Sequence, residues 1–149
     1  MKKQIDLQET IDYLKANGIT QPEIGIVLGT GLGKLVDEIE IEKEIAYSEI
    51  PNFPQATVEF HSGKLIYGIL SGKKVIVMAG RFHVYEGYNL WEVTYGIRTM
   101  HALGIKNLLI SKTNSNSAST EIYEASPPLS INCIPNFTNI KDETVNQKH

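Results

Sequence analysis

With 149 residues, a charged fraction of 21% and a net charge of -3, the chain has the size and composition of one globular domain. The negative balance argues against a nucleic-acid partner, because proteins that bind nucleic acids normally carry a basic surface. No apolar run is long enough for a membrane helix, no signal-peptide pattern stands at the start, and the one cysteine, Cys133, cannot form an internal disulfide. We therefore expect a cytoplasmic protein that binds neither a membrane nor nucleic acid.

A first helix is predicted close to the start of the chain. Asp6 is placed to cap it, with a glutamate three residues later as in a capping box. Leu7, Ile11 and Leu14 recur at helical spacing, and Gly18 ends the helix.

A glycine-rich segment follows the first predicted strand. The apolar run 23–28 is long enough for a buried strand, and it leads directly into Gly-Thr-Gly-Leu-Gly at residues 29–33. Glycines let backbone N–H groups approach an anion closely, and a following helix would add its positive end. The spacing fits neither the dinucleotide fingerprint nor the P-loop. From these residues alone, an anion site and an ordinary tight turn both stay open.

The sequence predicts β structure in the middle of the chain. Residues 43–60 predict a strand, a loop stiffened by two prolines and a second strand, and His61 follows in a turn. The runs 64–70 and 73–78 predict a hairpin, because the Ser-Gly pair at 71–72 is typical of its turn.

The most informative stretch comes at the end of that hairpin. Residues 80–88 place an arginine, a histidine, two tyrosines and a glutamate between and beside two glycines. Arg81 is one of only two arginines among fourteen basic residues, and its planar fork suits phosphate or carboxylate. Polar loops at the end of a rigid strand are where α/β proteins usually bind ligands. We predict a site here.

A second helix and a further strand complete the regular part. Asn89 can cap the helix, with a glutamate three residues on, and Gly104 stops it. Its predicted apolar face consists of Leu90, Val93, Ile97, Met100 and Leu103. The run 105–111 then predicts a buried strand, which gives a right-handed strand-helix-strand crossover.

The character of the sequence changes after Ser111. All twelve glycines lie at or before Gly104, and residues 112–149 are rich in Asn, Ser and Thr without a sustained apolar period. We interpret residues 1–111 as one unit and residues 112–149 as a weakly structured tail.

Four phrases in fixed order resemble the trimeric purine nucleoside phosphorylases. They are residues 25–33, 50–54, 61–65 and 78–88, and the resemblance covers roughly residues 20–111. The last phrase, which contains Arg-Phe-His-x-Tyr-Glu-Gly-Tyr, is highly specific. The related methylthioadenosine phosphorylases share the glycine segment but normally lack that motif. They are therefore the second choice of family.

The resemblance implies an α/β fold in three layers around a mixed sheet, apparently truncated here, and a homotrimer for the intact family. It also implies a reaction in which inorganic phosphate cleaves a purine (deoxy)ribonucleoside to the free base and (deoxy)ribose 1-phosphate. Phosphate is a co-substrate, and no metal or organic cofactor is involved.

The resemblance also assigns phosphate-binding roles. Thr30 supplies a hydroxyl beside the glycine backbone, Arg81 supplies a charged fork, and His83 supplies a further donor. His61 matches a histidine near the phosphate. From the residues alone, the alternatives are a surface ion pair for Arg81 and structural or turn histidines for His61 and His83.

Two more residues complete the candidate site. Tyr85 matches the tyrosine that contacts the ribose, with packing as the alternative. Glu86 is expected to orient His83 or its loop, with a structural carboxylate as the alternative, so that His83 and Glu86 are the catalytic candidates.

The sequence departs from the family after Ser111. The family continues with Asn-Ala-Ala-Gly-Gly, whereas residues 112–116 are Lys-Thr-Asn-Ser-Asn, and no purine-binding residue can be assigned in 112–149. We therefore expect a truncated or altered phosphorylase with little activity alone. The alternatives are a non-catalytic anion-binding module, and a remnant that docks on intact subunits.

Overall fold

The computed structural model describes residues 2–28, 33–55, 63–80, 87–113, 117–125 and 137–146. The elements in chain order are α1 (Lys2–Ala16), β1 (Ile24–Val27), α2 (Gly33–Asp37), β2 (Glu40–Ala46), the 3-10 helix η1 (Tyr47–Glu49), β3 (Lys64–Leu70), β4 (Lys73–Ala79), α3 (Leu90–Leu103), β5 (Asn107–Thr113), β6 (Ser117–Ala125) and β7 (Phe137–Asn146).

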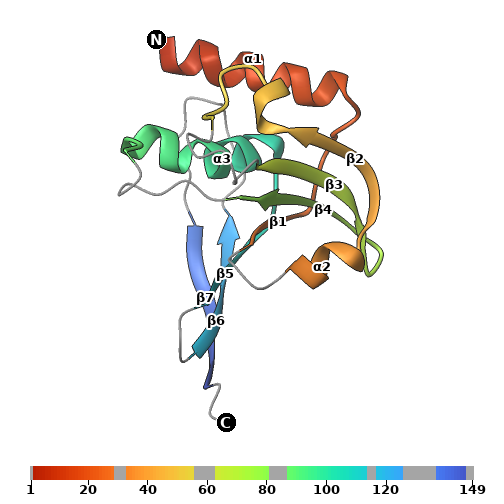
Figure 1. Cartoon of the computed structure of the whole chain (residues 1–149), viewed down its shortest axis with the longest axis vertical. Coiled ribbons are helices and arrows are strands. Elements are labelled where there is room, and N and C mark those ends of the chain that lie inside the picture. The colour runs from red at the N-terminus through yellow and green to blue at the C-terminus, as the bar shows by residue number, and fades with distance from the viewer. Residues whose placement is uncertain are drawn as a thin grey trace.

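The strands form one mixed, seven-stranded sheet in the order β2-β3-β4-β1-β5-β6-β7 (Figure 1). At its centre β1 pairs in parallel with both β4 and β5, so that Ile26 lies opposite Val77 on one side and Leu109 on the other. The outer pairs, β2–β3, β3–β4, β5–β6 and β6–β7, are antiparallel. The predicted crossover from β4 through α3 to β5 therefore spans β1.

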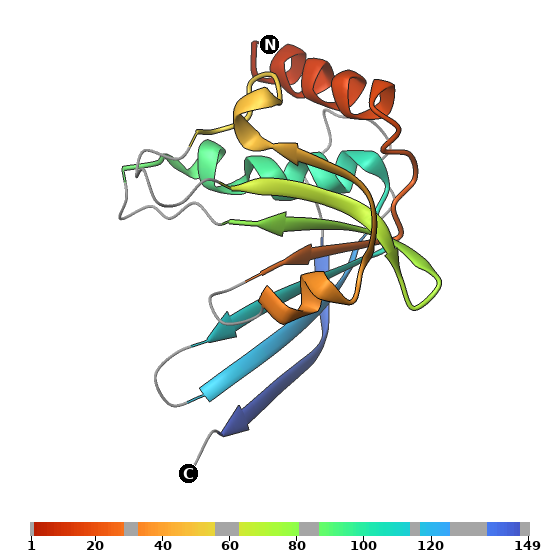
Figure 2. The same ribbon diagram turned by 45° about the vertical axis from the view of Figure 1, so that its right-hand side comes forward.

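The sheet is covered on both faces, which gives three layers. On β4, Ile76 and Met78 join the core under α1 and α3, whereas Val75 and Val77 join a second core that α2 covers. Figure 2 shows α3 and α2 on opposite sides of the central strands. Burial on both faces explains why these strands read as continuous apolar runs instead of alternating ones.

The first helix confirms one part of its prediction and corrects another. Leu7, Ile11 and Leu14 are buried in the core, and Gly18 ends the helix with φ 91°. Asp6 as the cap is wrong, because the helix already begins at Lys2. No breaker stands between Lys2 and Asp6, and the Asp6 carbonyl accepts a bond from Thr10 at 3.0 Å within the helix.

The predicted hairpin turn before β4 and both predicted ends of α3 are confirmed. Ser71 and Gly72 both have positive φ, 52° and 81°, as a tight two-residue hairpin turn requires. Asn89 caps α3 in a full capping box with Glu92, and Gly104 ends that helix at φ 98°.

The predicted apolar face of α3 is wrong at its first position. Leu90 is 72% exposed, because it stands at the first turn, where the helix begins. Burial instead centres on Tyr95, Thr99 and Met100. The Tyr95 hydroxyl lies 2.6 Å from the Thr10 hydroxyl, which ties α3 to α1.

The tail is the largest correction. In place of a weakly structured segment, β6 and β7 form an antiparallel hairpin that extends the sheet beyond β5 and away from the helices (Figure 1). Backbone pairing to the edge of β5 builds these strands, and such pairing needs no apolar period. Phe137 at the start of β7 contacts His101 of α3 with ring centroids 5.4 Å apart. The division of the chain at Ser111 remains an interpretation of the sequence.

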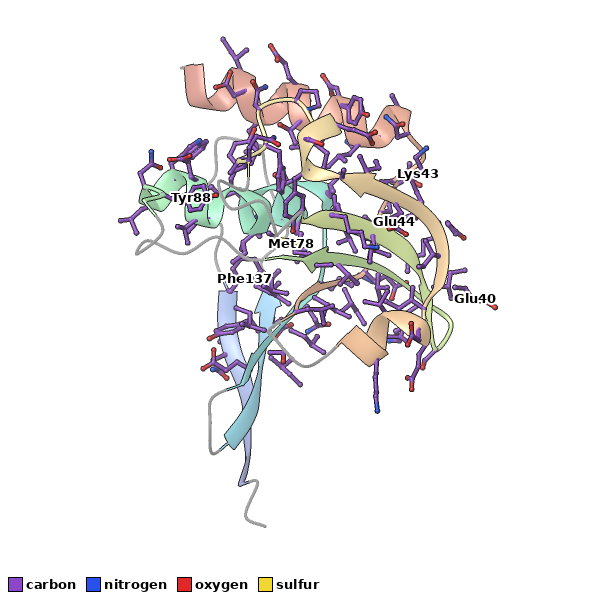
Figure 3. All side chains as sticks on the ribbon, viewed as in Figure 1. Glu40, Lys43, Glu44, Met78, Tyr88 and Phe137 are labelled. Carbon is purple, nitrogen blue, oxygen red and sulfur yellow. The ribbon has the colours of Figure 1, made fainter. Side chains whose placement is uncertain are left out.

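The opposite edge strand, β2, is charged. Glu40, Lys43 and Glu44, labelled in Figure 3, are exposed along it. Charges on an edge strand discourage pairing with another chain. In the part of the chain that the structure describes, no helix has the length and apolar character needed to span a membrane. The strand predicted near residue 58 lies outside the described residues.

Candidate functional site

Three segments meet at one end of the sheet, where the parallel strands β1 and β4 finish. We call this the carboxyl end. The backbone N–H of Leu28, just after β1, donates to the carbonyl of Met78 near the end of β4 at 3.2 Å. Because β3 runs antiparallel to β4, its first residue, Lys64, lies opposite Ala79. The segments 29–32 and 81–86 therefore leave the sheet where the segment 56–62 enters it.

The predicted site residues all belong to these three segments and lie outside the described residues: Thr30, His61, Arg81, His83, Tyr85 and Glu86. The structure thus defines where their segments are attached. The attachment points of Thr30, of His61 and of the Arg81–Glu86 stretch adjoin one another at the carboxyl end.

The carboxyl end is also a topological switch point. From β1 the chain crosses to the β2–β4 side of the sheet, whereas from β4 it passes through α3 to β5 on the other side of β1. In open α/β sheets, ligands bind outside the carboxyl ends of the strands at such a point. A helix follows the glycine segment as expected, but α2 has only five residues.

Tyr47 fastens the sheet-side ends of two of these segments. Its backbone N–H donates to the carbonyl of Gly63 at 3.1 Å, and its phenol donates to the carbonyl of Gly80 at 2.8 Å. Gly63 follows the segment that carries His61, and Gly80 precedes the one that carries Arg81. One buried tyrosine thereby holds both stems, by which we mean Gly63 and Gly80, the residues where the two segments join the sheet.

Glycine is required at both stems. A Cβ built on Gly63 would lie 2.1 Å from the Tyr47 ring, and one built on Gly80 would lie 2.9 Å from the Gly63 Cα. Gly80 also has φ 135°, a conformation that other residues rarely adopt. The missing side chains let the two backbones and the ring pack together.

The far ends of the same two segments are fastened by Gln55 and Tyr88. The Tyr88 phenol donates to the Gln55 carbonyl at 2.6 Å. The Gln55 amide in turn donates to the carbonyls of Tyr47 at 3.0 Å and Phe53 at 2.7 Å. Tyr88 lies on the α3 side of the sheet, as does Met78 (Figure 3). Each segment therefore begins and ends on the same small scaffold.

An aromatic cluster supports this scaffold. The rings of Tyr47 and Phe53 lie 4.7 Å apart, Phe53 meets Tyr95 edge-on at 5.7 Å, and Tyr95 meets Trp91 at 5.8 Å. Such pairs add stabilisation beyond their buried area. Trp91 thus packs against the core.

Burial dominates the electrostatics of the described part of the scaffold. It raises the pKa of the Tyr47 phenol far above its ordinary value of 10.0, so that the hydroxyl remains a hydrogen-bond donor at neutral pH. Burial likewise raises the pKa of Tyr95. Among the described residues, no group of three His, Cys, Asp or Glu side chains could hold a metal ion.

Sequence reasoning missed Tyr47 and Gln55 as parts of the site, and it included Tyr88 in the stretch 80–88 without assigning it a partner. A buried tyrosine signals that its hydroxyl needs a partner. The carbonyl acceptor of Tyr47, however, is 33 residues away in the chain, and nothing local identifies it.

Known proteins resemble the chain over the region that contains the predicted site residues. The sequence profile of the phosphorylase superfamily matches residues 23–113. Purine nucleoside phosphorylase 1 of Geobacillus stearothermophilus is 48% identical over 118 residues, covering 79% of this chain and 42% of the relative. The bovine enzyme is 42% identical over 106 residues, covering 71% of this chain and 37% of its own. The chain thus spans about two fifths of the length of these curated relatives.

Solved structures agree with the sequence matches. A Schistosoma mansoni purine nucleoside phosphorylase in complex with inosine is 44% identical, with a TM-score of 0.68, over 74% of this chain and 38% of that one. Its isoform 2, in complex with cytosine and ribose-1-phosphate, is 47% identical, with a TM-score of 0.66, over 70% of this chain and 37% of that one. The chain therefore belongs to the phosphorylase superfamily, within the purine nucleoside phosphorylase family.

Proposed function

We propose that the carboxyl end of the sheet carries the phosphate half of a purine nucleoside phosphorylase site. The observation that carries this proposal is the attachment of three segments, which bear Thr30, His61 and Arg81, at one switch point of the sheet. Hydroxyl, imidazole and guanidinium donors on adjoining segments form a suitable set for a phosphate anion.

The proposed reaction is phosphorolysis of a purine (deoxy)ribonucleoside. A phosphate oxygen attacks C1′ of the sugar, and the electron pair of the N-glycosidic bond leaves with the purine, which takes up a proton. Holding the phosphate beside C1′ lowers the barrier by positioning it and by stabilising the cationic sugar in the transition state. In this scheme Arg81 and His83 grip the anion, Tyr85 contacts the ribose, and Glu86 orients His83.

The Schistosoma relatives, solved with inosine and with ribose-1-phosphate, support this substrate class. The homotrimer is proposed from the family resemblance alone. Since no purine-binding residue is assigned in 112–149, we expect the chain alone to release hypoxanthine from inosine far more slowly than the Geobacillus relative. Release at a similar rate would contradict that expectation.

A non-catalytic phosphate-binding chain is the second candidate function. It is favoured by the departure of residues 112–116 from the family's sequence, because it needs the phosphate half of the site alone. Phosphate binding without any release of hypoxanthine would select it.

The phosphate site itself is tested by titration calorimetry with inorganic phosphate. Arg81→Ala should weaken binding at least about tenfold, because a charge-assisted hydrogen bond contributes roughly 1.5–3 kcal/mol.

Arg98→Ala is the matched control, since it removes the other arginine. Arg98 lies 4.8 Å over the Trp91 ring and donates to Thr94 within α3. Phosphate affinity should be unchanged in this variant. The proposal fails if the unaltered chain does not bind phosphate, or if both variants bind it equally.

A further inference from the structure

Two segments of the candidate site share a fastening point at Tyr47. Tyr47 bonds to the Gly63 carbonyl through its backbone and to the Gly80 carbonyl through its phenol. Gly63 is the last attachment of the segment that bears His61, and Gly80 is the first attachment of the segment that bears Arg81. The position of one segment relative to the other therefore depends on this residue.

The fastening is rigid. Tyr47 is 2% exposed, its ring packs against that of Phe53 with the centroids 4.7 Å apart, and its phenol would collide with any side chain larger than that of glycine at position 63. A fixed ring leaves the phenol oxygen little freedom. The Gly80 carbonyl is thus held at a defined distance from Gly63.

We propose that Tyr47 is a positioning residue for phosphate, one that sets the separation of the His61 and Arg81 segments without touching the anion. This inference rests on the proposed function. A ligand held by donors from two segments binds tightly only when both are in place, because displacements of about an ångström lose much of the interaction. The Tyr47 hydroxyl then contributes to affinity through geometry as well as to stability.

A second tyrosine in the same core provides a matched control. Tyr67 of β3 is also 2% exposed, and its phenol donates to the carbonyl of Thr20 at 2.9 Å. Thr20 precedes β1 and so lies at the opposite end of the sheet. Tyr67→Phe and Tyr47→Phe each remove one hydroxyl bonded to a backbone carbonyl, but only Tyr47→Phe affects the carboxyl end.

The experiment measures phosphate affinity by calorimetry and stability by urea unfolding for the 149-residue chain and both variants. We expect similar losses of stability in the two variants. Tyr47→Phe should weaken phosphate binding about five- to tenfold, the loss that corresponds to one hydrogen bond, whereas Tyr67→Phe should leave it unchanged. Equal affinities in the two variants, with phosphate still bound by the unaltered chain, would overturn the inference and leave the proposed function intact.

Tyr88→Phe extends the test if Tyr47→Phe folds poorly. It removes the bond that joins the far ends of the same two segments, from Tyr88 to Gln55. It should weaken phosphate binding as well, and unchanged binding in this variant would overturn the inference. An unaltered chain that binds no phosphate would overturn both the inference and the proposed function.

Discussion

The two ends of the sheet are connected in different ways. At the amino end, opposite the carboxyl end, the chain turns through short connections formed by neighbouring residues, although Tyr67 also bonds there to Thr20 across 47 residues. Ser71 and Gly72 form the β3–β4 turn with positive φ, and Gly18 and Gly104 end α1 and α3 in the left-handed conformation. Each of these turns depends on residues adjacent in sequence.

At the carboxyl end the connections are fastened by residues distant in sequence. Tyr47 reaches Gly80, and Tyr88 reaches Gln55, each across 33 residues. A turn fixed by local preferences tolerates changes elsewhere in the protein. A scaffold fixed by long-range contacts couples the segments it holds, which suits an end of the sheet where several segments must meet a single ligand.

The largest effect that separates the two ends is expected from Gly63→Ala. The added methyl would lie 2.1 Å from the Tyr47 ring, which is buried and bonded to Gly80. Overpacking of this kind costs typically about 1–3 kcal/mol, and movement of the ring would strain the phenol bond as well. We expect a loss of roughly 3 kcal/mol in the free energy of unfolding, measured by urea denaturation.

Gly72→Ala is the matched change at the amino end. No atom lies within 4 Å of the added methyl, so that only the backbone at φ 81° resists it. The left-handed conformation costs a non-glycine residue roughly 1–2 kcal/mol. A larger loss for Gly72→Ala than for Gly63→Ala would refute the claim that packing controls the carboxyl end.

Alkaline pH should lower the free energy of unfolding through Tyr47 at the carboxyl end. Burial raises the pKa of its phenol above 10.0 in the folded chain, whereas in the unfolded chain it titrates near its ordinary value. The contribution of the phenol to the stability of the fold is therefore complete below pH 10 and is lost as the pH rises toward the raised pKa. The loss approaches about 1.4 kcal/mol per pH unit.

Tyr47→Phe isolates this contribution. Urea unfolding at several pH values should give a constant difference in stability between the unaltered chain and the variant up to about pH 9.5, and a shrinking one above it. A difference that stays constant to pH 11 would show that the phenol does not contribute to the alkaline loss.

Local chemistry made much of the fold predictable from the sequence. The hairpin turn at 71–72, the Asn89–Glu92 capping box and the apolar run of β4 each depend on neighbouring residues, and the structure confirms them. The Asp6 cap failed because nothing in the sequence marks Lys2 as the true start. The β6–β7 hairpin was missed because backbone pairing to β5 builds it without an apolar pattern.

The candidate site was predictable in a different way. Arg81 and its neighbours stood out by residue type and by resemblance, and the sheet topology explains why the attachment points of their segment adjoin those of the segments that bear Thr30 and His61. The bonds of Tyr47 to Gly80 and of Tyr88 to Gln55 were not predictable, because each joins segments that only the folded sheet brings together.

The smallest effect at the carboxyl end is expected from its surface charges. Lys64, the first residue of β3, forms an ion pair with Glu44 of β2, and both side chains are about two-fifths exposed, at 43% and 41%. Exposed pairs contribute about 0–1 kcal/mol, since water and salt screen them. Lys64→Gln should therefore lower the free energy of unfolding by about 0.5 kcal/mol or less, a difference that fades in 1 M NaCl. A loss comparable to that of Gly63→Ala would mean that charge, and not the buried aromatic scaffold, holds β3 at this end of the sheet.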